Sequence, residues 1–439
     1  MVDRLPVTIV GAGLAGTLLA CALGRAGRRV DLYEKRPDPR AHGPDAGRSI
    51  NLALSVRGLH ALREIGLAEE VVKASILMRG RMIHGRDASL AFQPYGKDDT
   101  EALHSVSRAG LNRTLVEAAA RYPSVRMHFA HRCTGLDLMT GELEFLADGE
   151  DVRVTGEFIL GTDGAYSAVR AAMHRQERFD YSQDYLTHGY KELTIPPKPE
   201  GGFRMEPHSL HIWPRGSFMM IALPNADGSF TCTLFAPFDG PSGFAALTTE
   251  AAVVAYFRDQ FPDAVPLIPD LGPAFLANPT GSLVTVRCRP WHVGGRVALV
   301  GDACHAVVPF LGQGMNAAFE DCTVLVQCLD RHADRERALA EYERLRKEHT
   351  DALADLCIDN FIEMRDKVSS PLFRLRKKLA VLLHALFPRW YLPLYTMIEF
   401  TRIPYADARR RARRQDWVVR GVAGGVVVAV IGFLWWLLR

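Results

Sequence analysis

The chain has 439 residues, of which 48% are hydrophobic and 23% charged, and its formal net charge is +3. This length allows two or three domains with a large core, and the balance is that of a globular protein. The small charge, with no basic patch interleaved with aromatic residues in the body of the chain, argues against a nucleic-acid partner. The eight cysteines form no CxxC motif or His/Cys cluster, and with no signal peptide at the N-terminus they are expected to be reduced thiols.

The first predicted elements form a dinucleotide-binding unit. A strand at 7–10 leads into Gly11-x-Gly13-x-x-Gly16, a helix follows, and a second strand ends at Glu34. Gly11 permits a tight turn, Gly13 lets the backbone approach a pyrophosphate at the helix N-terminus, and Gly16 lets the helix lie close to the strand. Glu34 is placed to bind ribose hydroxyls and would repel a 2′-phosphate. This site is therefore expected to hold FAD or NAD rather than NADP.

Two later strand ends decide between these cofactors. FILGTDG ends a strand at Asp163-Gly164, GRVALVGD ends another at Asp302, and a glycine-spaced turn then opens a helix at Gly314. An NAD dehydrogenase has no use for two further dinucleotide-facing strand ends, whereas a flavin does. Asp302 would bind the ribitol hydroxyls, and the amides around Gly314 would bind the pyrimidine edge of the flavin. The competing interpretation makes Asp302 a helix N-cap. His305, close by, is interpreted as structural.

The remaining patterns define the fold class. Short alternating runs in 181–281 predict antiparallel strands on the substrate side, and 331–405 has a helical pattern. The prediction is an α/β protein with a Rossmann-like FAD-binding domain, an inserted antiparallel-sheet substrate domain and C-terminal helices that close the active site. The FAD-binding domain is expected at 1–75, 103–180 and 282–330, the sheet domain at 76–102 and 181–281, and the helical region at 331–405.

The tail differs from the rest of the chain. Residues 406–416 are arginine-rich and are predicted to be a basic linker, and 417–438 are predicted to be a membrane anchor. From Gly421 to Leu438, eighteen residues carry no charge, which at ~1.5 Å per residue is just enough for a transmembrane helix. A buried core helix, the alternative, would show one polar face. The arginines should stay on the cytoplasmic side, so the catalytic domain is expected there.

The GxGxxG motif, the Asp163-Gly164 pair and the Gly301-Asp302 pair follow one another in the order found in the class A flavoprotein monooxygenases, and the chain resembles that family. The resemblance covers essentially the whole chain and is strongest to the members that act on kynurenine. It implies NADPH-dependent hydroxylation of L-kynurenine by O2 to 3-hydroxykynurenine through a flavin C4a-hydroperoxide, in tryptophan degradation towards quinolinate and NAD. The segments that carry it are GRSINLALSVRGLHAL (47–62), SVSRAGLNRTLVEAA (105–119), VPFLGQGMNAAFEDC (308–322) and NFIEMRDKV (360–368).

The resemblance also implies site residues. An arginine fork suits the substrate α-carboxylate, tyrosines can add hydroxyl donors and ring walls, and asparagine offers both a donor and an acceptor. No protein residue is assigned a catalytic role, because the flavin carries the chemistry, and no metal is expected. Positions that match the family's flavin contacts are Glu34, Ala53, Arg108, Asp302, Met315 and Asn316, which join Gly11, Gly13, Gly16, Asp163 and Gly314 from the motifs. Positions that match its substrate contacts are Arg81, Tyr95, Asn360 and Tyr395.

Two alternatives stay open at this point. The chain could be another class A flavin aromatic hydroxylase, or a non-catalytic, membrane-tethered flavin-binding protein. A flavin halogenase is disfavoured because the sequence has no WxWxIP stretch. There is no second GxGxxG unit for NADPH, which is therefore expected to bind transiently over the flavin. The sequence leaves the oligomeric state open.

Overall fold

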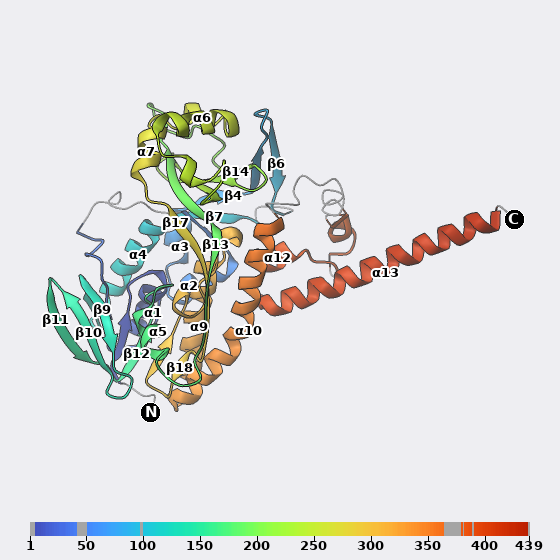
Figure 1. Ribbon diagram of the computed structural model, residues 1–439. Helices are drawn as coiled ribbons and strands as arrows, with labels where there is room; N and C mark the ends of the chain where they lie inside the picture. The colour runs from blue at the N-terminus through green and yellow to red at the C-terminus, as the bar shows by residue number, and fades with distance from the viewer. Residues whose placement is uncertain are drawn as a thin grey trace.

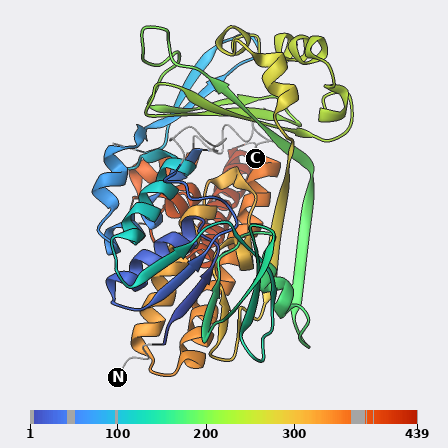
Figure 2. The same ribbon diagram turned by 90° about the vertical axis from the view of Figure 1, so that its left-hand side faces the viewer.

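The structure, a computed structural model, describes residues 5–41, 51–96, 100–363, 379–380, 382–388 and 390–437. The chain forms two stacked layers, and its C-terminal helix extends away from both (Figure 1). One layer is built on a parallel sheet with helices, and the other on an antiparallel sheet. Two long strands run from one layer into the other, as the view in Figure 2 shows.

The parallel sheet has six strands in the order β18-β19-β12-β1-β2-β8, with only β18 antiparallel to its neighbour. β1 is buried along its whole length, which explains its apolar sequence VTIV. Val10 of β1 pairs with Gly161 of β12, so the GxGxxG turn and the Asp163-Gly164 turn follow neighbouring strands at the same edge. The strands are β1 (Val7–Val10), β2 (Val30–Tyr33), β8 (Val125–His128), β12 (Phe158–Gly161), β18 (His292–Val293) and β19 (Val297–Leu299).

Helices and a small sheet pack around these strands. α1 contacts both α4 and α9, and α9 also contacts α2. In the small sheet β11-β10-β9, Phe145 stacks on Tyr33 of β2 with ring centroids 4.4 Å apart. The elements are α1 (Leu14–Arg25), α2 (Val56–Glu64), α3 (Ala68–Lys73), α4 (Arg108–Ala120), α5 (Ala168–Met173), α9 (Gly314–Arg331), β9 (His131–Leu136), β10 (Glu142–Ala147) and β11 (Glu150–Thr155).

The second layer is a seven-stranded sheet in the order β17-β13-β16-β15-β14-β5-β6. Its strands pair antiparallel, as predicted for 181–281, except that β14 runs parallel to β5. α6, α7 and two short 3-10 helices pack on it around Trp213, Phe230 and Phe257. The elements are β5 (Gly80–His84), β6 (Leu90–Pro94), β13 (Asp180–Ile195), β14 (Ser209–Pro214), β15 (Met219–Pro224), β16 (Phe230–Pro237), β17 (Gly281–Arg289), η1 (Phe244–Ala246), α6 (Glu250–Gln260), η2 (Val265–Leu267) and α7 (Leu271–Ala277).

A third sheet, β3-β7-β4, connects the layers. Asn51 of β3 donates through Nδ2 to the carbonyl of Pro224 at 3.1 Å, at the end of β15. The Ser105 hydroxyl of β7 donates to the same carbonyl at 2.8 Å. These buried bonds fix the position of the strand that carries Ala53. The strands are β3 (Asn51–Leu54), β4 (Ile76–Met78) and β7 (Leu103–Ser107).

The C-terminal helices lie against the flavin motifs. α10 contacts α9, the η3 turn and α13, and α12 contacts α13. α10 begins where the Asp334 carboxylate accepts from the backbone N–H of Glu336 at 2.9 Å, a normal N-cap. The elements are α8 (Asp302–His305), η3 (Pro309–Leu311), α10 (Arg335–Ile362), α12 (Leu394–Glu399) and α13 (Tyr405–Leu437).

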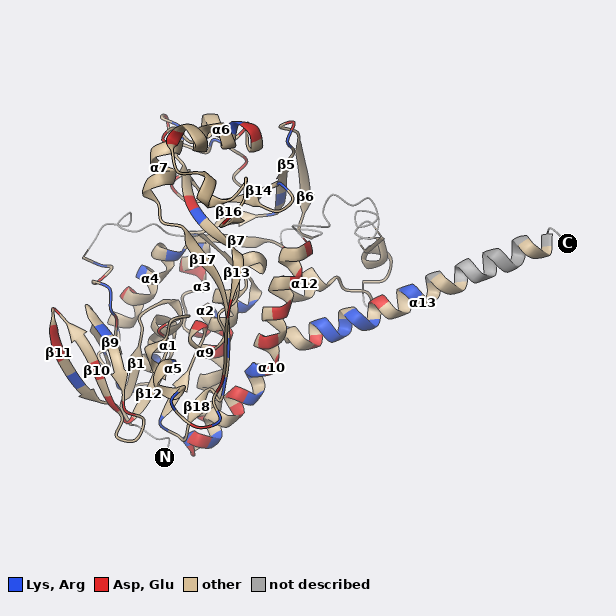
Figure 3. Ribbon diagram, viewed as in Figure 1, with Lys and Arg blue, Asp and Glu red and all other residues tan. Residues whose placement is uncertain are grey.

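The predicted linker at 406–416 is wrong, because these residues belong to one continuous helix, α13. Tyr405 and Ala408 are fully buried, and Arg409 pairs with Asp355 of α10 at 2.6 Å. Arg410 pairs with Asp407 one turn earlier, also at 2.6 Å. The arginines therefore help to hold the first part of the helix on the body of the protein, where they gather in Figure 3.

The predicted transmembrane helix is not supported. In the part of the chain that the structure describes, no helix is both long enough and apolar enough to span a membrane. The side chains of 423, 426–434 and 437–439, much of the predicted anchor, lie outside the described residues.

Candidate active site

The GxGxxG turn has the close packing that its glycines were predicted to allow. Gly11 has a φ of +104°, and a Cβ there would lie 2.7 Å from the Thr162 carbonyl oxygen. A Cβ on Gly16 would lie 1.9 Å from the Gly11 carbonyl oxygen. A Cβ on Gly13 would meet nothing within 4 Å. The N-terminus of α1 therefore has open space beside Gly13, where a pyrophosphate can approach the backbone.

Glu34 lies beside this turn at the end of β2. Its side chain is buried, and Oε2 accepts from the backbone N–H of Ala12 at 2.8 Å. Oε1 accepts from the backbone N–H and the Nε of Arg36, at 3.0 and 2.8 Å. A carboxylate fixed next to the glycine turn fits the ribose of an adenine dinucleotide. The exposed Arg36 side chain is the partner that a ribose hydroxyl would have to share or displace.

The Gly301-Asp302 turn lies between the two glycine-bearing helices. A Cβ on Gly301 would lie 3.0 Å from the Cβ of Ala318 in α9 and 3.5 Å from the Cβ of Ala15 in α1. Asp302 is exposed and is the first residue within α8, whose N-cap position is occupied by Gly301. The N-cap alternative is therefore wrong. The Asp302 carboxylate is available for ribitol hydroxyls.

Asn316, predicted to contact the flavin, is fully buried, and its side chain joins α9 to β3. Its Nδ2 donates to the Ala53 carbonyl at 2.9 Å, and its Oδ1 accepts from the Ser55 backbone N–H at 3.0 Å. Met315, the preceding residue, is also buried. The Asn316 side chain is thus engaged in hydrogen bonds within the protein. At this end of α9, the groups that could bind a flavin are therefore the backbone amides from Gly314 onward.

Two other predicted flavin residues, Asp163 and Arg108, lie next to the start of α5 and at the start of α4, respectively. Asp163 Oδ2 accepts from the backbone N–H of Ala168 at 2.7 Å, so this carboxylate organises the start of α5. Its Oδ1 is buried without a partner, and burial raises the pKa of Asp163. Arg108 is exposed at the first position of α4. Asn112 of the same helix donates to the Ala12 carbonyl at 3.0 Å, which places α4 beside the glycine turn.

Three of the four predicted substrate residues meet at one place. The Arg81 guanidinium lies over the rings of Tyr395 and Tyr95, 4.6 and 5.6 Å from their centroids. The two rings stack with centroids 5.8 Å apart and an interplanar angle of 23°. Arg81 Nε and the Tyr95 hydroxyl are buried and have no hydrogen-bond partner in the described structure. A half-buried cation whose Nε has no partner, next to a buried hydroxyl without one, fits an incoming carboxylate.

The protonation states of this group suit that ligand. Burial lowers the pKa of Arg81, but its tyrosine neighbours and Glu399 raise it, and the net shift is upward. Burial raises the pKa of Tyr95 to about 12, even though Arg81 opposes this shift. The arginine is therefore a cation and the tyrosine a neutral hydroxyl donor at neutral pH.

Asn360, the fourth predicted residue, lies near the end of α10. Its Nδ2 donates to the Phe310 carbonyl of η3 at 2.9 Å. The Phe310 ring stacks on Phe361, with centroids 4.4 Å apart. Asn360 thus holds the turn that precedes Gly314, and no described contact joins it to Arg81 or to the two tyrosines.

Glu399 is a site residue that the sequence analysis missed. It lies four residues after Tyr395 in α12 and is 1% exposed. Its Oε2 accepts from Nε2 of Gln313 at 2.6 Å, and Gln313 stands between the two glycines of the flavin turn. Burial raises the pKa of Glu399 to about 8, even though Arg81 and Arg57 oppose this shift. The i, i+4 spacing from Tyr395 was the available signal.

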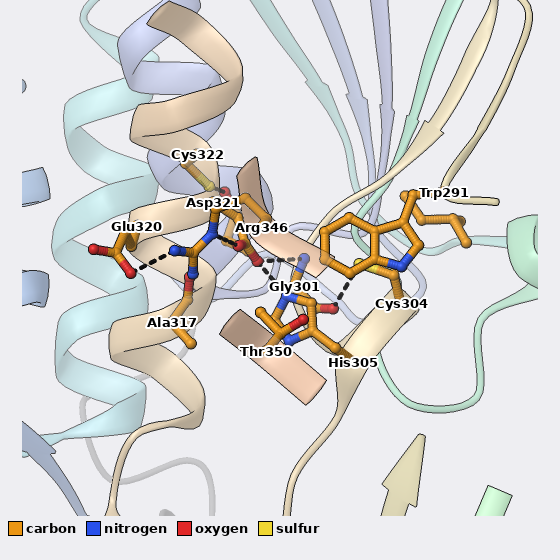
Figure 4. Close-up of polar contacts among 12 residues, drawn as sticks. Trp291, Gly301, Cys304, His305, Ala317, Glu320, Asp321, Cys322, Arg346 and Thr350 are labelled. Atoms are coloured by element: carbon orange, nitrogen blue, oxygen red, sulfur yellow. Dashed lines mark hydrogen bonds and ion pairs between the residues drawn. The ribbon is translucent and has the colours of Figure 1, made fainter. Parts of the chain in front are cut away.

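A buried ionic network between α9 and α10 contacts the Gly301 turn (Figure 4). The Asp321 carboxylate accepts from the Gly301 backbone N–H at 3.2 Å, from His305, and from Nε of Arg346 at 2.6 Å. Arg346 also donates to Glu320 at 2.6 Å. His305 is therefore a structural histidine, as expected.

The network continues to the substrate group. Glu320 pairs with Arg57 at 2.8 Å, and the Arg57 guanidinium lies 4.1 Å from the centroid of the Tyr405 ring. The Tyr405 hydroxyl donates to Oε1 of Gln313 at 2.9 Å. Gln313 then donates to Glu399. Contiguous buried polar contacts thus connect the Gly301 turn with the residues around Arg81.

Known proteins are similar to this chain in sequence and in fold. A model of the FAD-binding domain family matches residues 4–260 and 270–356. Kynurenine 3-monooxygenase of Myxococcus xanthus is 50% identical over 422 residues, 96% of this chain and 91% of the relative. The enzyme of the same name from Dictyostelium discoideum is 46% identical, with 92% and 90% of the two chains covered. The chain belongs to the kynurenine 3-monooxygenase family.

Solved structures of lower sequence identity show the same fold. An oxygenase of 2-methyl-3-hydroxypyridine-5-carboxylic acid superposes with a TM-score of 0.68 at 23% identity, over 84% of this chain and 95% of its own. For PqsL of Pseudomonas aeruginosa the TM-score is 0.65 at 21% identity, with 83% and 97% covered. As in the kynurenine 3-monooxygenase family generally, the cofactor is FAD. Glu34, the open space at Gly13 and the unpaired Asp302 fit it.

The first prediction concerns Asp302. In Asp302→Ala the ribitol hydroxyls lose an acceptor, which should cost about 1–3 kcal/mol of FAD binding. The purified variant should contain less flavin, measured by the ratio of absorbance at the flavin and protein maxima and by titration of the apoprotein with FAD. Asp151→Ala, an exposed aspartate of β11, is the matched control. Full flavin content in Asp302→Ala would contradict the assignment.

Proposed function

We propose that this protein hydroxylates L-kynurenine to 3-hydroxykynurenine with O2 and NADPH, using bound FAD. The observation that carries the proposal is the group of Arg81, Tyr95 and Tyr395, in which the cation has no carboxylate partner among the described residues. Relatives that share about half of this sequence are named for this reaction. L-kynurenine offers the carboxylate that such a group lacks.

The chain's own residues would bind and orient the substrate. Arg81 would take the α-carboxylate through two parallel charge-assisted hydrogen bonds, and the Tyr95 hydroxyl would donate a third. The rings of Tyr95 and Tyr395 would then line the aminobenzoyl part. When bound, the flavin supplies the oxygen-transfer chemistry, with electrons from NADPH. Since the amino group already makes the substrate ring electron-rich, no protein base is needed to activate it.

Water must be kept from the reacting centre. Leu311 is buried and Phe310 is half-buried in the turn before Gly314, within an apolar cluster that includes Val308 and Phe235. Asn360 holds the Phe310 carbonyl, so the turn is fixed against α10. These residues would form an apolar wall beside the flavin, which is the protein's main contribution once the substrate is placed.

The direct test is NADPH oxidation by the purified yellow protein. We expect L-kynurenine to accelerate it, with O2 consumed and 3-hydroxykynurenine formed in equal amounts. Acceleration by another aromatic acid instead would make the protein a different class A hydroxylase. If no aromatic acid accelerates the reaction, the protein is a non-catalytic flavin-binding protein, and the proposal fails.

The substrate residue Arg81 gives a sharper prediction. Arg81→Ala leaves a desolvated carboxylate unpaired, which should weaken kynurenine binding by about 2–5 kcal/mol. The KM for kynurenine should rise accordingly, while the flavin content stays normal. Arg86→Ala is the control, because Arg86 is exposed just after the same strand and bonds to Gln260. An unchanged KM in Arg81→Ala would remove this residue from the site.

We further propose that the C-terminal helix holds the protein at a membrane, with the catalytic domain on the cytoplasmic side. Two features of the described part of α13 support this. Its outer part points away from the body (Figure 1), and the helix has exposed apolar side chains at Trp417, Val422 and Trp435. Arginines precede them, and these would stay on the cytoplasmic side near anionic lipid headgroups.

Truncation after Gln415 tests this localisation. Gln415 donates to the Trp390 carbonyl at 2.8 Å, so the shortened chain keeps the contact that ends the docked part of α13. The truncated protein should appear in the soluble fraction with its flavin intact, and the full-length protein in the membrane fraction. Full-length protein in the soluble fraction would contradict the proposal.

A further inference from the structure

Glu399 is a buried carboxyl for which the proposed reaction has no role. Its Oε2 accepts from Gln313, whereas its Oε1 is buried without a hydrogen-bond partner in the described structure. A carboxylate oxygen buried without a donor is costly. A proton on Oε1 would remove the charge and so lower that cost, and the geometry therefore fits a neutral carboxylic acid better than a carboxylate.

The other buried carboxyls nearby have ion-pair partners. Glu320 accepts from two arginines, at 2.6 and 2.8 Å, and Asp321 accepts from Arg346 and from His305. Glu399 has no ion-pair partner among the described residues, and neither has Arg81. The fold therefore pairs the acids of the α9–α10 network but leaves this acid and this arginine unpaired next to the substrate group.

The surroundings of Glu399 favour the neutral form. Arg81, Arg57 and the bond from Gln313 favour the ionised form, but burial outweighs them. The titratable groups that face Glu399 are Arg81 of β5, Arg57 of α2, Tyr95 after β6, Tyr395 of α12, Cys357 of α10 and Tyr405 of α13. The tyrosines and the cysteine have pKa values raised by burial, so the two arginines are the only charged groups of this set at neutral pH.

Resting on the proposed function, we propose that Glu399 is a positioning residue that must carry a proton before a substrate carboxylate can occupy Arg81. An ionised Glu399 would compete for the Arg81 cation and repel the incoming carboxylate. A protonated Glu399 leaves Arg81 free. The proton comes from solvent, and no bond other than the O–H of Glu399 is formed.

This role predicts the sign of a pH effect on binding. With the pKa of Glu399 at about 8 in the free protein, the residue is already protonated at pH 7, and substrate binding needs no further proton. Above that pH the free protein must take up a proton in order to bind. By linkage, the Kd for kynurenine should rise about tenfold between pH 7 and pH 9.

Glu399→Gln separates the charge from the hydrogen bond. The amide oxygen can still accept from Gln313, but the side chain cannot ionise. Kynurenine binding to the oxidised, FAD-loaded protein is measured by the change in flavin absorbance, without NADPH, from pH 7 to pH 9. The ammonium group of the substrate titrates equally with both proteins, so the ratio of their Kd values isolates Glu399. Glu348→Gln, an exposed carboxyl paired with Arg410, is the control and should keep the wild-type profile.

We expect the tenfold weakening in the wild type and its loss in Glu399→Gln. If kynurenine binds both proteins with the same pH profile, this inference is overturned while the proposed function stands. If kynurenine binds neither at any pH, both fall. Should the variant fail to fold, wild-type calorimetry at pH 8 in two buffers of different ionisation enthalpy decides the question. Uptake of about half a proton on binding supports the inference, and no uptake overturns it.

Discussion

The buried ion pairs between α9 and α10 are the constraint on which the rest of the site depends. Arg346 lies within hydrogen-bond distance of both Glu320 and Asp321, and Asp321 also holds the backbone of Gly301. Removing one partner of such a buried pair typically costs about 3–5 kcal/mol, because a desolvated charge remains. One arginine therefore fixes the Gly301 turn, the helix that begins at Gly314 and the helix that carries Asn360 in a single arrangement.

The proposed substrate group differs from this network, because its arginine has no carboxylate partner among the described residues. Arg57 and Arg346 are buried, and each pairs with a carboxylate. Arg81 has aromatic rings around it but no carboxylate partner among the described residues. Arg170 and Arg215, which are also buried, donate to backbone carbonyls instead. Arg81 Nε has neither kind of partner in the described structure, and a cation in this state costs stability that a bound carboxylate can offset. The contrast within one structure points to a binding site more strongly than Arg81 does alone.

The sequence predicted the parts of the site that depend on local geometry. The roles of Gly11 and Gly16 follow from a turn of six residues, and the structure shows contacts there that no side chain could fit. Arg81, Tyr95 and Tyr395 come from separate parts of the chain, so only the family resemblance could group them. The linker prediction failed because a dense run of arginines was interpreted as a solvent-exposed segment, whereas Arg409 forms an ion pair with a residue of another helix.

The contacts that the sequence did not predict share one physical cause, which is that they join residues distant in the chain. Asn316 reaches residues 261 and 263 positions away, and Gln313 reaches Glu399 across 86 positions. Apart from its i, i+4 spacing from Tyr395, nothing in the local pattern distinguishes Glu399 from an ordinary helix-terminal glutamate, which is normally exposed. It is identified by burial and by its missing second partner.

Gln313 connects residues of α12 and α13 with the glycine turn that precedes α9. Its amide is fully buried, donates to Glu399 and accepts from Tyr405, so both ends of the side chain are held. A side chain fixed at both ends transmits displacement rather than absorbing it. Gly312 and Gly314 flank it, and Gly312 has a φ of +65°, which suits a turn that few other residues could adopt. A change in charge at Glu399 would therefore reach Gln313, next to Gly314, where the flavin ring is expected, so the proposed carboxylate site and the flavin site are both in contact with this one side chain.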